Sequence, residues 1–157
     1  GIKAVKGVIA QGHDLELVVF GEKLKDPQPL FDAAGFEFEY HYRPAREKLR
    51  KIYVSCDIFL CSSWYEGLGL TGMEAMACRC SLVTTNTGGC LEYAINGKTA
   101  LVSAPRDVSA LSLNLIRLLE DETLLKSLSE DGYHRINEFN WEENCDRLMC
   151  LFNENLT

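Results

Sequence analysis

Two glutamates, Glu66 and Glu74, lie eight positions apart on either side of a glycine-rich segment. Carboxylate oxygens accept hydrogen bonds, and the hydroxyl groups of a sugar are suitable donors. Glycines at 67, 69 and 72 let the main chain come close to a ligand, because they carry no Cβ atom. Residues of these types at this spacing are suited to binding hydroxyl groups beside exposed backbone.

The elements predicted around this segment are suited to hold an anion. The apolar run Asp57–Cys61 precedes it and is typical of a strand, whereas Ala75-Met76-Ala77 continues it as a helix. The first N–H groups of a helix lack intrahelical partners and carry about half a positive charge, so phosphate oxygens bind there readily. A diphosphate together with hydroxyl groups describes a nucleotide sugar, and we infer that class of ligand.

Each feature of the segment also has a structural interpretation. Thr71 and Glu74 have the spacing of a capping box, in which the Glu74 carboxylate would return to the first turn of its own helix. Glu66 is alternatively an exposed or turn-stabilising acid. Residues 67–72 match Gly-x-Gly-x-x-Gly, but no acidic residue ends a strand about 20 residues later, as dinucleotide binding requires. The glycine pattern alone therefore does not identify the ligand.

A second loop, Thr87-Gly88-Gly89, follows the predicted strand Ser81–Thr85. Open parallel sheets bind ligands at the carboxyl ends of their strands, so we expect Thr87, Gly88 and Gly89 to contribute to the same site. The alternative is a plain turn. For Glu92, a structural role in the turn that follows is the favoured interpretation.

Composition limits the classes of function. The chain has 157 residues, enough for one domain, with 46% hydrophobic and 25% charged residues and a formal net charge of −7. This charge argues against broad binding to nucleic acid or anionic membranes, which depends on excess Lys and Arg. The basic cluster from Arg43 to Lys51 fits either a solvated helix face or a contact with membrane headgroups or a partner.

The cysteines and the apolar runs point to a reducing compartment. Seven cysteines make an odd number, and none has the paired Cys-x-x-Cys spacing of a zinc site, so we expect no metal. Several of them fall within apolar patterns, where free Cys packs as a small hydrophobe, which favours the cytoplasm over secretion. We find no signal peptide, and no apolar run approaches the ~20 residues of a membrane span.

Periodicity predicts an α/β domain covering residues 1–157. Strands alternate with helices, which implies an open parallel sheet with helices on both faces, and the C-terminal third is predicted to be helical. Asp107, Asp121 and Asn140 are suitable helix caps, the last with Glu143 in a capping box. The expected strands are 15–20, 36–41, 57–61, 81–85 and 99–102, and the main expected helices are 1–10, 44–56, the segment after Gly72, 108–119, 124–136 and 141–152.

Three segments, 62–70, 73–78 and 87–93, resemble the group-one family of glycosyltransferases. They place two acidic residues around a glycine loop, then a Gly-Gly-x-x-Glu sequence, then the Asn96-Gly97 turn before a short apolar strand, in the order of that family. A looser resemblance extends over nearly the whole chain. The resemblance implies a GT-B architecture of two Rossmann-like domains, of which this chain would be the C-terminal, donor-binding half.

The resemblance also implies roles for single residues. Glu66 would be the catalytic residue beside the donor sugar, and Glu74 would hold the ribose hydroxyls. The amides of Gly67, Leu68, Gly69 and Leu70 would face the sugar and the phosphates. The substrate would be a nucleoside-diphosphate sugar, with no cofactor.

The resemblance further implies the rest of the enzyme and its reaction. The acceptor site would lie on an N-terminal domain that precedes the chain, together with the first strand and the Arg and Lys that hold the diphosphate. The reaction would transfer a hexosyl unit to a hydroxyl, with retention of configuration, at the cytoplasmic side and with peripheral membrane association. The alternative is a non-catalytic module that binds a nucleotide or a partner.

One departure from the family pattern concerns a turn. Arg79 stands where the family often has a glycine, in the sequence Ala77-Cys78-Arg79-Cys80 between the predicted helix and the strand Ser81–Thr85. This leaves only the geometry of that turn open.

Overall fold

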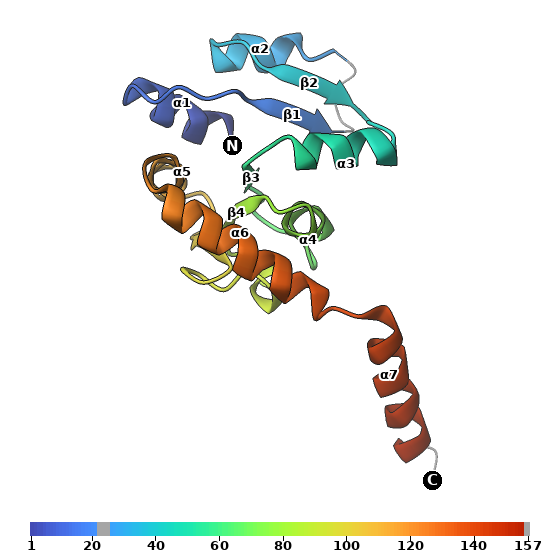
Figure 1. The fold of residues 1–157 in the computed structure, drawn as a ribbon. Coiled ribbons are helices and arrows are strands. Elements are labelled where there is room, and N and C mark those ends of the chain that lie inside the picture. Colours follow the sequence, from blue (N-terminus) through green and yellow to red (C-terminus); the bar gives the residue numbers. More distant parts are fainter. Residues whose placement is uncertain (22–25, 156–157) are drawn as a thin grey trace.

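The fold alternates parallel strands with helices in a computed structural model that describes residues 1–21 and 26–155 (Figure 1). Part of the segment between the expected strands 15–20 and 36–41 lies outside the described residues. The strands are β1 (Val18–Gly21), β2 (Glu39–Tyr42), β3 (Ile58–Cys61), β4 (Ser81–Thr85) and β5 (Ala100–Ser103). The helices are α1 (Ile2–Ala10), α2 (Gln28–Ala34), α3 (Arg46–Val54), α4 (Leu70–Ala77), the 3₁₀ turn η1 (Gly89–Glu92), α5 (Val108–Glu120), α6 (Glu122–Asn137) and α7 (Trp141–Asn155).

All the strand pairs are parallel, as the alternation of strands and helices predicted. β1 pairs with β2 in a two-stranded sheet, and β3, β4 and β5 form a three-stranded sheet with β4 at its centre. Parallel neighbours in such folds are joined by crossover connections: here α2 lies between β1 and β2, α4 between β3 and β4, and the 3₁₀ turn η1 between β4 and β5. The α/β class and the helical C-terminal third are therefore confirmed.

Helices cover both faces of the three-stranded sheet. Side chains alternate between the faces of a strand, so Val83 and Leu82 of β4 point in opposite directions. Val83 packs with Val8 of α1 and Leu115 of α5, whereas Leu82 packs with Met76 of α4. Every residue of β4 is buried. Burial on both faces explains why the sequence of β4 shows no alternation between apolar residues and charged ones.

Two of the expected helix caps form as predicted. The side chain of Asp107 accepts a hydrogen bond from the Ala110 N–H, and that of Asp121 accepts one from the Leu124 N–H, each at 2.9 Å. Asn140 also accepts a hydrogen bond at the start of α7, from Glu142 N–H at 2.9 Å. These bonds satisfy N–H groups that the first helical turn leaves without partners.

The turn at Arg79 keeps a left-handed backbone without a glycine. Arg79 has φ of 66°, and its carbonyl accepts a hydrogen bond from the Ser129 hydroxyl at 2.7 Å. Its guanidinium lies 4.0 Å from the ring centre of Tyr133 and forms an ion pair with Glu130. Contacts with α6 therefore stabilise a backbone conformation that is unfavourable for Arg.

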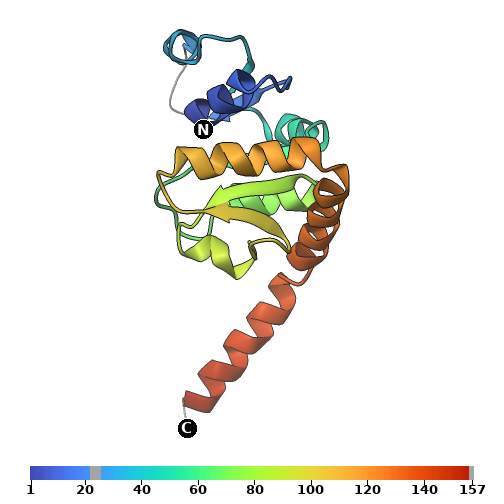
Figure 2. The same cartoon turned by 90° about the vertical axis from the view of Figure 1, so that its left-hand side faces the viewer.

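Helix α7 extends away from the rest of the domain (Figures 1 and 2). The apolar stripe predicted for it includes Trp141, Leu148, Met149 and Phe152, all of which are exposed, with Trp141 at 81%. In an amphipathic helix such a stripe normally packs against another element. Within the described residues the stripe of α7 has no such cover.

Candidate functional site

The two predicted loops meet at the carboxyl ends of β3 and β4. Glu66 and Gly88 form an isolated parallel bridge, so the loop after β3 runs beside the loop after β4. A Cβ atom on Gly89 would overlap the carbonyl oxygen of Gly67, which shows how closely the two backbones approach. The structure therefore brings together the Glu66–Leu70 segment and the Thr87–Gly89 segment that the sequence predicted to share a site.

The Glu66 carboxylate is half-buried over the glycine loop. The Ser63 hydroxyl donates a hydrogen bond to Glu66 Oε1, and the Cys61 thiol lies 4.0 Å from the same oxygen. A Cβ atom on Gly69 would lie only 3.0 Å from Oε2, so the carboxylate packs directly on the loop. These contacts orient Glu66, and a carboxylate has further acceptor positions for the hydroxyl groups of a ligand.

The N-terminus of α4 is available to an anion. Gly69 is the residue before the helix, with φ of 78°, and no side chain caps it. The Gly72 N–H donates to the Gly69 carbonyl at 3.0 Å, which leaves the N–H groups of Leu70 and Thr71 ahead of the first helical hydrogen bond. Leu70 is 64% exposed. As the first residue of α4, it stands at the positive end of the helix dipole.

The capping-box interpretation of Thr71 and Glu74 is wrong. Helix α4 begins at Leu70, so Thr71 already lies inside the helix and cannot be its cap. The physical reason is Gly69, whose left-handed backbone starts the helix one residue before Thr71 and one turn before Glu74.

Glu74 is instead exposed and is held by α3. The Tyr53 hydroxyl donates to Glu74 Oε2 at 3.2 Å. Tyr53 is buried and makes edge contacts with the rings of Phe20 and Phe59. Burial, followed by the charge of Glu74, raises the pKa of Tyr53, so the phenol keeps its proton and remains a donor.

Thr87, Gly88 and Gly89 lie at the edge where a ligand would bind, but the Gly88 N–H is already used. It donates to the side chain of Asn86 at 3.1 Å. Thr87 and Gly89 are half-buried, and Gly88 is exposed with φ of 93°. The loop is thus a structured turn whose main contact with the site is its bridge to Glu66.

Three residues that support the site were not identified from the sequence. Tyr53 contacts Glu74, Ser63 contacts Glu66, and the Tyr93 hydroxyl donates to the Gly69 carbonyl at 2.7 Å. The tyrosine contacts link residues 21 and 24 positions apart. No local pattern signals such contacts. Only Ser63, three residues before Glu66, lies near enough in sequence to have been proposed as a partner.

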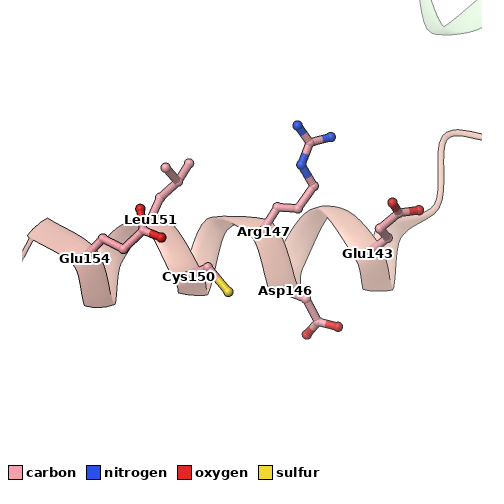
Figure 3. Close-up of a pocket in the computed structure, with 6 residues that line it drawn as sticks. All are labelled: Glu143, Asp146, Arg147, Cys150, Leu151 and Glu154. Carbon is pink, nitrogen blue, oxygen red and sulfur yellow. The ribbon is translucent and has the colours of Figure 1, made fainter.

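Other surface features lie away from this edge. A hollow of ≈ 340 Å³ runs along α7 between Glu143 and Glu154 (Figure 3), and one of ≈ 610 Å³ lies beside α2, between Gln28 and Phe38. No group of three or more metal-binding side chains occurs in the described part of the chain. No helix among residues 1–21 and 26–155 is both long and apolar enough to span a bilayer.

Comparison with known proteins identifies the family. The family described as "Glycosyl transferases group 1" matches residues 1–135, most of the chain. The chain belongs to this glycosyltransferase family.

Two curated relatives match different lengths of the chain. The O-antigen chain mannosyltransferase B of Escherichia coli is 33% identical over 99 residues, which cover 63% of this chain and 25% of that protein. The capsular polysaccharide biosynthesis glycosyltransferase CapM of Staphylococcus aureus is 24% identical over 153 residues, covering 90% of this chain and 40% of that protein. The chain therefore spans less than half the length of these relatives.

Solved structures share the fold. The C-terminal domain of the group 1 family protein LpcC from Francisella tularensis superimposes with a TM-score of 0.75 at 22% identity, covering 88% of this chain and 76% of that one. Anabaena HepE, solved in complex with UDP and glucose, gives a TM-score of 0.79 at 17% identity. The match covers 96% of this chain and 44% of HepE. This likeness confirms the fold of a C-terminal GT-B domain.

Proposed function

We propose that this chain is the donor-binding domain of a nucleotide-sugar-dependent glycosyltransferase, which transfers a hexosyl group to an acceptor hydroxyl with retention of configuration. The observation that carries the proposal is the uncapped N-terminus of α4, which lies between the carboxylates of Glu66 and Glu74. The relatives are named for mannosyl transfer and capsular polysaccharide synthesis, and HepE was solved with UDP and glucose. These names support a sugar nucleotide as the donor.

The chemistry follows from where charge develops. When the bond between the sugar and the diphosphate breaks, negative charge builds on the leaving phosphate oxygen. Donors that are already oriented stabilise that charge more than they stabilise the ground state. The N–H groups of Leu70 and Thr71 provide such donors at the positive end of α4. Glu66 orients the sugar and supports its developing positive charge, and Glu74 holds the ribose hydroxyls.

Replacing each glutamate in the full-length enzyme tests these roles. Glu66→Ala should reduce kcat greatly while the melting temperature stays unchanged, because the contacts of this half-buried carboxylate are few. Glu74→Ala should raise the dissociation constant for the nucleoside diphosphate with little loss of stability. Glu92→Ala, an exposed glutamate in η1, is the matched control and should leave both quantities unchanged. Normal turnover in Glu66→Ala would remove Glu66 from the site.

In this proposal, the part of the enzyme outside this chain joins the two sheets through a further strand and supplies the other half of the substrate site. β1 and β3 each have one edge that pairs with no strand in the described residues, and Figure 1 places the N-terminal end between them. A Cβ atom on Gly1 would lie 3.0 Å from the Ser62 hydroxyl, directly after β3. One further parallel strand, preceding Gly1, fits between β1 and β3. An N-terminal domain before it would carry the acceptor site, and the loop after the strand would carry the Arg and Lys that hold the diphosphate.

The alternative is a domain that binds a nucleotide or a partner and performs no chemistry. Calorimetry of this chain with uridine, guanosine and adenosine diphosphates measures the binding step alone. A transfer assay of the full-length protein, with the anomeric configuration of the product read by NMR, then separates an enzyme from a binding module. We place the enzyme in the cytoplasm, at the inner face of a membrane. Vesicle co-sedimentation of the full-length protein tests the membrane association.

A further inference from the structure

Tyr93, the residue that follows η1, reaches into the glycine loop. Its side chain is 2% exposed, and its hydroxyl donates to the Gly69 carbonyl at 2.7 Å. The contact depends on Gly72, because a Cβ atom there would lie 2.7 Å from the Tyr93 hydroxyl oxygen and 3.4 Å from two ring carbons. The absence of a side chain at position 72 thus makes room for the hydroxyl of a residue that lies 21 positions later.

This hydrogen bond determines the orientation of one peptide group. The peptide bond between Gly69 and Leu70 is planar and trans, so its carbonyl and its N–H point in opposite directions. The carbonyl is held by two donors, the Tyr93 hydroxyl and the Gly72 N–H at 3.0 Å. The N–H of Leu70 therefore points away from the helix and the buried ring. Gly69 has no side chain to restrict rotation, so the peptide needs such an external restraint.

The Tyr93 hydroxyl is a permanent donor at neutral pH. Burial raises the pKa of Tyr93, and the nearby groups of Cys90, Cys61 and Glu66 act in the same direction. The phenol therefore stays protonated. Its ring packs in the cluster formed by Met76, Leu82 and Cys90, so the hydroxyl has little freedom to leave the carbonyl.

We propose that Tyr93 is a positioning residue that directs the N–H group of Leu70 at the diphosphate of the donor, and that Gly72 is required for it to do so. The proposal rests on the donor-binding function proposed above. Tyr93 does not touch the ligand. It acts through the Gly69–Leu70 peptide, and its removal should weaken diphosphate binding while the fold is retained.

The test uses Tyr93→Phe in the full-length enzyme, because this variant removes only the hydroxyl oxygen and the full-length enzyme also carries the Arg and Lys proposed to hold the diphosphate. Affinities for uridine, guanosine and adenosine diphosphates are measured by calorimetry. A hydrogen bond contributes about 0.5–1.5 kcal/mol, so we expect roughly 2- to 10-fold weaker binding of whichever diphosphate the unmodified enzyme binds. Amide hydrogen exchange should become faster at residues 67–72 and remain unchanged in α5. Tyr133→Phe, on α6, is the matched control and should change neither.

A second variant tests the role of Gly72. Gly72→Ala should displace the Tyr93 hydroxyl and weaken diphosphate binding by a similar factor. In the double variant Gly72→Ala/Tyr93→Phe, the clash with the hydroxyl is absent, so the two losses should not add. Additive losses would contradict the proposed coupling.

The outcomes separate the two proposals. If the unmodified full-length enzyme binds none of the three diphosphates, the donor site itself is refuted, and the role of Tyr93 with it. If the unmodified enzyme binds one of them and Tyr93→Phe binds it equally well, with unchanged exchange at residues 67–72, only the role of Tyr93 is refuted. Weaker binding together with faster exchange in the loop supports both.

Discussion

The two parallel sheets differ sharply in how they are packed. In the three-stranded sheet the central strand β4 is buried along its whole length and the edge strand β3 is half-buried, whereas in the two-stranded sheet every residue of β1 is half-buried and the ends of β2 are exposed. The loops that carry Glu66, Gly69 and Gly88 all follow strands of the three-stranded sheet. The candidate site therefore lies on the sheet that contains a fully buried central strand, which the β1–β2 sheet lacks.

The largest expected effect is a difference in stability between two Val→Ala variants, one in each sheet. Val83→Ala in β4 removes two methyl groups from a fully buried position, and should lower the free energy of unfolding by roughly 2–3 kcal/mol. Val19→Ala in the half-buried β1 should cost clearly less. Urea denaturation of both variants measures the two values, and equal losses would show that the two sheets are equally packed.

Alkaline pH should destabilise the surroundings of the three-stranded sheet. Burial raises the pKa of Cys80, directly before β4, from an ordinary 9.0 to about 12, and it also raises the pKa of Tyr53 and Tyr93. The folded chain holds these protons more tightly than the unfolded chain. The resulting stabilisation is complete below about pH 9 and is lost as the pH rises toward 12.

Urea denaturation in the presence of a reductant, between pH 8 and pH 11.5, measures this loss. Cys80→Ala should show a shallower decline, because one of the three groups is gone. A stability that does not change over this range would contradict the assigned burial of Cys80.

Extension of the chain at its N-terminus should reduce the contrast between the sheets. If a further strand pairs with β1 and β3, the amide groups on the facing edges of both strands become hydrogen-bonded. Slower hydrogen exchange should then appear in Val18–Gly21 and Ile58–Cys61, while β4, already paired on both sides, should change little. Unchanged exchange in β1 and β3 of the longer chain would show that the strand does not bind between them.

The smallest effect is expected at Arg79. Arg79→Gly relieves about 1–2 kcal/mol of left-handed backbone cost, but it loses an exposed ion pair and a cation–π contact of about 0.5–1 kcal/mol. The melting temperature should therefore change little. Arg79→Ala keeps the strained backbone and loses the same contacts, so its melting temperature should be lower than that of the unmodified chain and that of Arg79→Gly. If Arg79→Ala melts like the unmodified chain, the contacts with Glu130 and Tyr133 do not stabilise the turn.

Local signals in the sequence predicted much of this fold. The strand Ser81–Thr85 forms with the predicted bounds, and Asp107 and Asp121 cap the helices that they were expected to cap. Such features depend on residues a few positions apart. The division of the strands into two sheets, by contrast, depends on contacts between elements distant in sequence.

The site was predictable to the extent that its residues follow one another. Glu66, the glycines and Thr87-Gly88-Gly89 lie in two short segments, and the structure brings these segments together through one bridge. The start of α4 was predicted wrongly, because a glycine with positive φ competed successfully with the Thr71 capping signal. Tyr53 and Tyr93 could not be predicted, since their hydroxyl groups find partners only after α3 and η1 have packed.

The near-contact between Gly89 and the Gly67 carbonyl has a consequence for engineering. Because any larger residue at position 89 would push the two loops apart, a change of donor specificity cannot be introduced at that position without also moving the segment that bears Glu66. Mutational libraries should leave Gly89 unvaried. Thr87 offers a more tolerant position on the same loop, since its change need not separate the two main chains.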